Sequence, residues 1–165
     1  MPNPEYISSS RSPFVVIGPS IAYIKLSNGL FAVIDSEDCD LVGGSWTSIT
    51  DINTSYAQAR RGGNRISMHR LIMGSPDCAI DHRNRNGLHN WKGNLRNATR
   101  SQNAANKPSS GRSGLKGAYA RSSGWQAAIR IKGKTITIGT FATAELAHAA
   151  YCAAAKDAFG DFFHG

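Results

Sequence analysis

Four polar residues follow one another at fixed intervals in the middle of this 165-residue chain. Asp81 and His82 stand side by side after the apolar residues 78–80, Asn94 lies twelve positions after His82, and Asn103 lies nine after Asn94. A carboxylate and an amide carbonyl are hard oxygen ligands of the kind that Mg²⁺ takes in small number, because this ion keeps several waters. A histidine titrates near neutral pH and can take a proton from water. The set predicts metal-assisted hydrolysis, with His82 as the general base.

Residues 68–106 carry these positions between two further words, MHRLIM and NLRNATRSQNAAN. In residue types, intervals and both words, this stretch resembles the active site of the HNH nucleases. It is most similar to the phage and intron-borne homing endonucleases, in which the last H of the name is an Asn. The resemblance implies a divalent-metal-dependent endonuclease that hydrolyses DNA phosphodiester bonds with Mg²⁺ or Mn²⁺. It implies that Asp81 and Asn103 bind the metal, that His82 is the catalytic base, and that Asn94 is a catalytic-site residue whose amide fixes the loop carrying His82.

The local sequence is compatible with the strand, loop, strand and helix of the ββα-metal motif that the resemblance implies. Residues 78–80 are typical of a strand end, the polar residues 83–93 of a loop, and residues 94–96 of a short return strand. Thr99 and Gln102 match a capping box and predict that a helix begins there. Taken singly, the site residues are more typical of a turn, a helix start and a surface Asp-His pair than of a nuclease, so the nuclease interpretation depends on the whole set.

His69, in the word MHRLIM, has two open interpretations. A structural or phosphate-contact role is favoured over a catalytic one.

Length, hydropathy and cysteines restrict the class of protein. A chain of 165 residues allows one domain or two small ones. It has no apolar run of eighteen residues and no signal-like N-terminus, so neither a membrane span nor secretion is expected. Cys39, Cys78 and Cys152 form no CxxC pair, so we expect neither a disulfide framework nor the structural zinc that some HNH enzymes carry. The expected compartment is the cytoplasm, that of a bacterial host if the gene is phage or intron encoded.

The charge is unevenly distributed along the chain. The net charge is +8, of which residues 1–60 contribute −3 and residues 61–165 contribute +11. A basic C-terminal two-thirds favours a polyanionic partner, here double-stranded DNA.

The N-terminal region is expected to form a small antiparallel sheet. Residues 1–20 are Pro- and Ser-rich and are expected to be irregular. Within residues 23–34, apolar runs lie on both sides of Asn28-Gly29, a pattern that predicts a hairpin. Residues 46–49 and 55–59 predict two more strands that lead into residues 66–73. Packing is favoured over DNA contact as the role of this region. The first predicted domain is 1–106, with the nuclease core at 66–106, followed by a Pro-, Ser- and Gly-rich linker at 107–113.

Residues 114–165 predict a second module, made of a three-stranded antiparallel sheet packed on one helix. Strands are expected within 115–123, 124–133 and 134–141, and a helix after Thr143 that ends at Gly160. Alternation puts Trp125, Ala127, Ile129, Ile131, Ile136 and Ile138 on the face under the helix. It puts Gln126, Ala128, Arg130, Lys132, Thr135 and Thr137 on the outer face. The helix stripe expected to face the sheet is Leu146, Ala150, Ala154 and Ala158, with Ala147 and Tyr151 beside it.

The words GWQAAIR, IGTF and TAELAHAAY in this module resemble the plant ethylene-response-factor (Apetala-type) DNA-binding domain. That family inserts its sheet into the major groove, and the resemblance implies DNA contacts from matching positions of this chain. The sequence departs from the plant pattern at Tyr119, Ala128, Thr135 and Thr137, so the plant target sequence is not carried over. The expected DNA-binding residues of the whole chain are Arg83, Arg96, Arg100, Lys107, Arg112, Lys116, Tyr119, Arg121, Arg130, Lys132, Thr135 and Thr137.

The predicted fold is therefore α+β: a small antiparallel N-terminal sheet, a ββα-metal HNH motif, and a three-stranded antiparallel sheet packed on one helix. The predicted activity is nicking or cutting of double-stranded DNA, and the sequence does not choose between a monomer and a homodimer. The alternative is a catalytically inactive, sequence-specific DNA-binding regulator. An RNA-binding regulator is disfavoured because the sheet is expected to lack exposed aromatic residues for base stacking.

Overall fold

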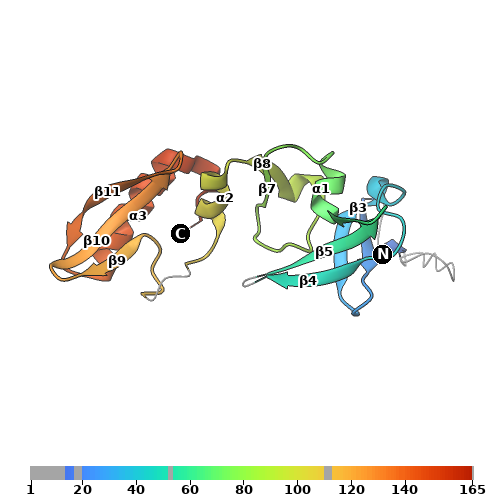
Figure 1. Cartoon of the computed structure of the whole chain (residues 1–165), viewed down its shortest axis with the longest axis horizontal. Coiled ribbons are helices and arrows are strands. Elements are labelled where there is room, and N and C mark those ends of the chain that lie inside the picture. Colours follow the sequence, from blue (N-terminus) through green and yellow to red (C-terminus); the bar gives the residue numbers. More distant parts are fainter. Residues whose placement is uncertain (1–13, 17–19, 52–53, 110–112, 165) are drawn as a thin grey trace, which may run out of the picture. The chain divides into compact units, whose positions relative to one another are not determined.

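The computed structural model describes residues 14–16, 20–51, 54–109 and 113–164, which form a mixed α+β protein of small antiparallel sheets (Figure 1). The chain divides into two compact units between Asn97 and Ala98. This division lies ahead of the predicted linker at 107–113, so the helix that follows Thr99 belongs to the second unit. The α+β class predicted from the sequence is confirmed.

The first sheet of the N-terminal unit has the antiparallel order β1 (Phe14–Val16), β2 (Ile21–Lys25) and β3 (Phe31–Asp35). The hairpin predicted at Asn28-Gly29 joins β2 to β3, and Gly29 takes a φ of +86°, a conformation that favours glycine. β1 falls within the segment expected to be irregular. Its pairing with β2 was not signalled by the Pro- and Ser-rich composition around it.

A second sheet, with the order β4 (Thr47–Asp51), β5 (Thr54–Arg61) and β6 (Asn64–Ser67), follows in the same unit. The region therefore forms two three-stranded sheets where the sequence predicted one. The short helix α1 (Met68–Ile72) comes directly after β6 and was not predicted. One core buries side chains from both sheets and α1, including Ile24, Ile34, Trp46 and Met68. The indole N–H of Trp46 donates to the Val42 carbonyl at 2.6 Å, so its burial costs no hydrogen bond.

The central motif has the predicted order of elements. β7 (Ala79–His82) pairs with β8 (Leu95–Ala98) in a two-stranded sheet, with the 3₁₀ turn η2 (Lys92–Asn94) before β8. The helix α2 (Arg100–Asn106) follows. The predicted capping box is present: the Gln102 N–H donates to Thr99 Oγ1 at 3.2 Å, and the Thr99 N–H donates to Gln102 Oε1 at 2.8 Å.

The C-terminal unit contains the three predicted strands and the long helix. β9 (Ala118–Arg121), β10 (Gly124–Ile131) and β11 (Lys134–Phe141) form an antiparallel sheet with β10 in the middle. Helix α3 (Ala144–Phe159) packs on one face of this sheet (Figure 1). The Leu146 N–H donates to Thr143 Oγ1, and Gly160 ends the helix before the 3₁₀ turn η3 (Gly160–Phe162), as predicted.

Two details of the predicted packing are wrong. The buried side of α3 is formed by Ala144, Ala147, Tyr151, Ala155 and Phe159, whereas Leu146 is 53% exposed and Ala158 is also exposed. In the sheet, Ile136 is 48% exposed and does not pack under the helix. A β-bulge opposite Ala127 and Ala128 makes Ile138 an extra residue of β11. The bulge does not explain the exposure of Ile136, which pairs directly with the buried Ile129.

At Gly117 the backbone of the second unit lies close to Tyr151 of α3. The φ of Gly117 is +76°, and a Cβ added there would lie 2.1 Å from Tyr151 Cγ. We expect Gly117→Ala to destabilise the second unit by about 3 kcal/mol, because it adds positive-φ strain to an overpacked contact. Gly114→Ala is the matched control: its φ is +69° but no atom lies within 4 Å of the added Cβ, so only the strain applies. Urea unfolding followed by circular dichroism measures both, and equal losses would contradict this packing.

Candidate active site

Asp81 and His82 are the last two residues of β7, and both are buried, with 3% and 6% of their surfaces exposed. Successive side chains of a strand point to opposite faces. Asp81 accordingly meets Arg96 of the neighbouring strand β8, while His82 meets Asn90 from the loop between the two strands. The two adjacent residues of the motif therefore have separate sets of partners.

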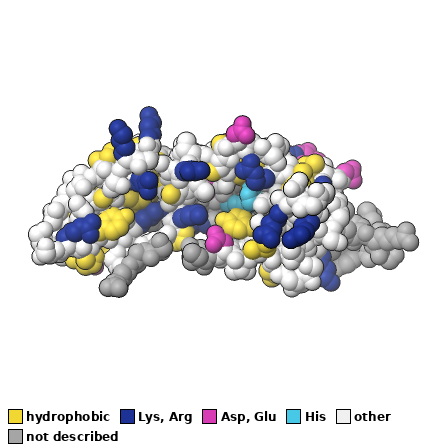
Figure 2. Space-filling view, viewed as in Figure 1, with side chains coloured by type: hydrophobic (Ala, Val, Ile, Leu, Met, Phe, Trp, Pro, Cys, Tyr) yellow, Lys and Arg dark blue, Asp and Glu magenta, His cyan; other side chains and the backbone are white. Residues whose placement is uncertain are grey.

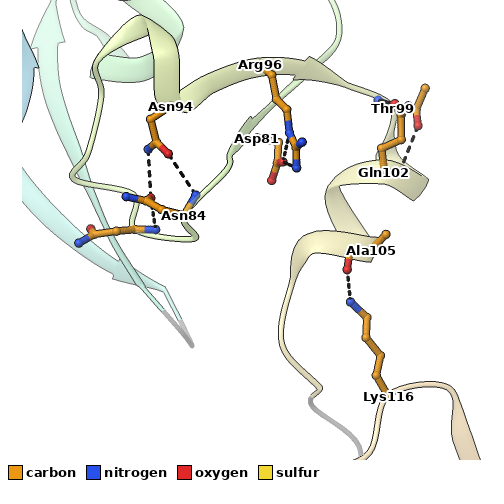
Figure 3. Close-up of polar contacts among 9 residues, drawn as sticks. Asp81, Asn84, Asn94, Arg96, Thr99, Gln102, Ala105 and Lys116 are labelled. Carbon is orange, nitrogen blue, oxygen red and sulfur yellow. Dashed lines mark hydrogen bonds and ion pairs between the residues drawn. The ribbon is translucent and has the colours of Figure 1, made fainter. Parts of the chain in front are cut away.

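Arg96 holds Asp81 through a close ion pair (Figure 3). Its Nε and Nη2 atoms both lie 2.7 Å from Asp81 Oδ2. Arg96 is only 9% exposed, so its guanidinium compensates the buried carboxylate within the first unit. The sequence placed Arg96 among the DNA-binding residues; in the structure its guanidinium is buried in this ion pair, and the DNA-binding role stays a prediction.

Asn90 is the hydrogen-bond partner of His82, and the sequence did not single it out. Its Oδ1 lies 3.0 Å from His82 Nε2, and the residue is fully buried. Its Nδ2 donates to the Leu88 carbonyl at 3.2 Å and faces Met68 Sδ at 3.6 Å. In the word LHNW it resembles any loop asparagine, because the contact depends on how the loop folds back over β7.

Asn94 fastens the loop that carries His82. Its Nδ2 donates to the His89 carbonyl at 2.7 Å and to Asn84 Oδ1 at 3.0 Å, and its Oδ1 accepts from the Asn84 N–H at 3.1 Å (Figure 3). These contacts join the two ends of the segment between β7 and β8. They agree with the loop-fixing role expected for Asn94, whereas its part in catalysis stays a prediction.

Both N-terminal sheets support this loop. On β3, the Val33 N–H donates to the Leu88 carbonyl at 2.8 Å, and the Asn90 N–H donates to the Val33 carbonyl at 2.6 Å. On β5, the Gly87 N–H donates to Thr54 Oγ1, and a Cβ at Gly87 would lie 2.5 Å from the Ser55 carbonyl oxygen. The predicted packing role of the N-terminal region is present in these contacts.

Lys92 fastens the far end of the loop to the N-terminal unit. Its ammonium group lies 2.6 Å from Glu37 Oε1 and 2.8 Å from Asp38 Oδ1, and its N–H donates to Asp35 Oδ2 at 2.7 Å. The bonds to Asp38 and Glu37 raise the pKa of Lys92, and Lys92 lowers the pKa of Glu37. Part of the acidic excess of the N-terminal region is therefore used to hold the loop.

The rings of Tyr56 and His69 pack against the ring of His82. The His69 and His82 rings meet edge to face with centroids 5.2 Å apart, and the Tyr56 ring lies 5.7 Å from His69 and 5.8 Å from His82. Burial lowers the pKa of His69 to about 4, and burial also lowers the pKa of His82, partly offset by the bond to Asn90. Both imidazoles are therefore held in the neutral form near pH 7, the form that can accept a proton.

The other members of the predicted site lie in the second unit. Asn103 is partly buried on α2, and Arg100 and Lys107 are exposed at the two ends of this helix. Arg112 lies outside the described residues. The Lys116 ammonium group donates to the Ala105 and Lys107 carbonyls, each at 2.5 Å (Figure 3). It thereby caps the C-terminal end of α2.

The outer face of the second sheet displays most of the remaining candidates. Tyr119 is 48% exposed, and the Arg121 guanidinium lies over its ring at 5.9 Å. Gln126 joins this group, since its Oε1 accepts from Arg121 and its Nε2 donates to Thr137. The exposed residues expected to contact DNA on this unit are Arg121, Arg130, Lys132, Thr135 and Thr137. Arg83, beside His82 in the first unit, is exposed as well.

Asp81 offers a carboxylate, the kind of hard oxygen donor that a magnesium-like ion takes. Among the described residues no three His, Cys, Asp or Glu side chains gather as a metal-binding group, and the three cysteines are free thiols. Mg²⁺ needs only one or two protein carboxylates when phosphate and water complete its shell. Because Arg96 already bonds Oδ2, an ion that binds Asp81 must share this carboxylate with Arg96 or displace it.

Comparison of the chain with protein-family models, with curated proteins and with solved structures finds no match. In the described part of the chain, no helix has both the length and the apolar character needed to cross a membrane.

His69 generates a prediction about acid stability. Its Nδ1 is buried and has no hydrogen-bond partner among the described residues, and its pKa falls from the usual 6.5 to about 4 in the folded protein. Between these pH values the unfolded chain binds a proton at His69 that the folded chain does not, so stability is lost as the pH falls. We expect His69→Phe to keep the ring packing and to reduce this loss, by up to roughly 3 kcal/mol.

Urea unfolding of both proteins between pH 7 and pH 4 measures this effect. His89, whose pKa is also lowered by burial, is present in both proteins and cancels in the comparison. His82 contacts His69, so the difference between the two proteins reports His69 together with its coupling to His82. Parallel stability curves for the two proteins would show that His69 is not a buried neutral group.

Proposed function

We propose that this protein is a divalent-metal-dependent DNA endonuclease of the HNH type. The observation that carries the proposal is the buried His82 at the end of β7, which is held by Asn90 and directly follows Asp81 in the strand. A neutral imidazole beside a carboxylate is the pair needed to activate water near a bound cation. In this proposal, β7, β8 and α2 are the two strands and the helix of a ββα-metal motif.

In the proposed reaction His82 accepts a proton from a water molecule as the water oxygen attacks phosphorus. The new P–O bond forms while the bond to the leaving oxygen breaks, and that oxygen departs with the electron pair of the broken bond. Asn94 takes no proton in this scheme: its amide keeps the loop closed, so that His82 holds its place beside β7.

Asp81 would hold Mg²⁺ or Mn²⁺, and the resemblance to HNH nucleases adds Asn103 as a second oxygen ligand. The ion supplies charge stabilisation for the phosphorane and for the leaving oxygen. Arg96 neutralises Asp81 before the ion binds, which weakens the attraction of this single carboxylate for a cation. Substrate phosphate would then complete the shell of the ion, so binding of metal and DNA is expected to be mutually reinforcing.

The second unit is proposed to bind double-stranded DNA through the outer face of its sheet. Arg121 and Arg130 are exposed there with Tyr119, on a chain whose charge is strongly basic after residue 60. Figure 2 shows Lys and Arg side chains spread over the visible face of the molecule, with fewer Asp and Glu among them. Phosphate contacts of this kind orient DNA, and base contacts supply specificity.

The alternative function is a DNA-binding regulator without nuclease activity. One observation favours it: Arg96 bonds the Asp81 carboxylate from within the protein, as a structural ion pair would. An enzyme and a regulator differ in whether a cation competes successfully for Asp81.

Replacing His82 tests the enzyme. With supercoiled plasmid and Mg²⁺ or Mn²⁺, we expect the wild type to nick or linearise DNA and excess chelator to stop it. We expect His82→Ala to reduce the rate at least about 100-fold, because the general base is lost. DNA affinity should stay nearly unchanged. An inactive wild type that binds DNA would instead support the regulator, and equal loss of affinity and rate in His82→Ala would assign His82 a structural role.

Replacing Arg130 tests the DNA-binding face. We expect Arg130→Gln to weaken DNA binding at all sequences and to lower the slope of log affinity against log salt by about 1, as for the loss of one phosphate contact. Lys156→Gln removes the same charge from the exposed side of α3 and is the matched control. Fluorescence anisotropy at several salt concentrations gives both slopes. If the two variants change the slope equally, the sheet face has no special part in binding.

A further inference from the structure

The amide of Asn90 has only one orientation that satisfies its neighbours. Its Nδ2 lies 3.2 Å from the Leu88 carbonyl oxygen, which can only accept a hydrogen bond, so the NH₂ group must face Leu88. The Met68 sulfur on the same side is also an acceptor. The carbonyl oxygen of the amide is thereby turned toward His82.

This orientation decides which nitrogen of His82 carries the proton. Asn90 Oδ1 is only an acceptor, so His82 Nε2, at 3.0 Å, must be the donor. A neutral imidazole has one N–H, and the lone pair then resides on Nδ1. With the opposite tautomer, two lone pairs would face each other in a fully buried contact.

We propose that Asn90 is a positioning residue that selects the Nε2–H tautomer of His82 and thereby makes Nδ1 the nitrogen that accepts the proton from water. The tautomer assignment stands on the contacts alone, whereas its catalytic meaning rests on the proposed nuclease function. Asn90 itself touches neither water nor substrate in this role.

Asn90 can perform this role because the N-terminal sheet fixes its backbone. Its N–H donates to the Val33 carbonyl of β3 at 2.6 Å, and the Val33 N–H donates to the Leu88 carbonyl at 2.8 Å. The Leu88 carbonyl also accepts from the Asn90 side chain, so Val33 contacts both the backbone of Asn90 and the carbonyl that orients its amide. Through this bridge, β3 determines the orientation of a ring that lies about fifty positions later in the sequence.

The test is the tautomer of His82, measured on the full chain by long-range ¹⁵N–¹H correlation with ¹⁵N-labelled histidine at mildly alkaline pH. The His82→Gln variant identifies the His82 signals by their loss. We expect protonated-type Nε2 and unprotonated-type Nδ1 shifts in the wild type. Asn90→Asp, which keeps an acceptor, should retain this pattern, and Asn90→Leu should populate the other tautomer. Asn97→Leu, the same change at an exposed position of β8, should leave the pattern as it is in the wild type.

A wild type in the Nδ1–H form, or an Asn90→Leu protein that keeps the Nε2–H form, would overturn the proposal. If Asn90→Leu does not fold, the wild type and Asn90→Asp still decide, because each has a definite expected tautomer.

The nicking assay separates this inference from the proposed function. We expect Asn90→Leu to lower kcat about 10- to 100-fold without raising KM, and Asn90→Asp to restore most of it. A wild type with the expected tautomer but no nicking would reject the nuclease and keep the tautomer assignment. Unchanged kcat in an Asn90→Leu protein whose tautomer has shifted would reject the positioning role.

Discussion

The requirement that buried polar groups be paired governs the centre of the N-terminal unit. Asp81, His82, Asn90, Asn94 and Arg96 are all at least nine-tenths buried in a unit of fewer than one hundred residues. Each such group left without a partner would cost about 1–3 kcal/mol, and more for a charge, so the loop between β7 and β8 can take only conformations that satisfy all of them. The pairings found are Asp81 with Arg96, His82 with Asn90, and Asn94 with the loop backbone. The network specifies the loop more strongly than its sparse apolar contacts could.

The Asp81–Arg96 pair connects this stability requirement to the proposed chemistry. Burying a carboxylate alone is expensive, and Arg96 compensates that cost when no cation is bound. The same pairing makes the carboxylate a weaker ligand, because a cation must share or replace a bond that is already made. In the proposed nuclease, a hard ion brought with substrate phosphate would change that balance, since the phosphate would offer Arg96 a new partner of the same chemistry. The ion pair is therefore compatible with a site that assembles on DNA, and equally with a purely structural site in a binding protein.

The elements could largely be predicted from the sequence because their signals are local. The Asn28-Gly29 hairpin, the Thr99–Gln102 capping box and the Thr143 cap each depend on residues a few positions apart. Long-range packing was harder to predict. Ile136 is exposed although it pairs with the buried Ile129, and the α3 stripe is turned so that Ala155 and Phe159 lie inside and Leu146 outside. The partners of His82 and Asp81 were missed for the same reason: Asn90 and Arg96 look like an ordinary loop amide and an ordinary surface cation until the fold brings them to β7.

Within the N-terminal unit, the residues of the motif and the residues that hold the loop in place come from different parts of the sequence. Every residue of the sequence motif in this unit lies after residue 66, yet the groups that orient the loop come from β3, η1 (Ser36–Asp38) and β5. Val33 fixes Asn90, the acidic residues 35–38 fix Lys92, and Thr54 fixes Gly87. Three of the acidic residues of the first 60, Asp35, Glu37 and Asp38, therefore bind the exposed Lys92 within the same unit. A fragment that began at residue 66 would hold the residues of the motif in this unit and lack the contacts that orient them.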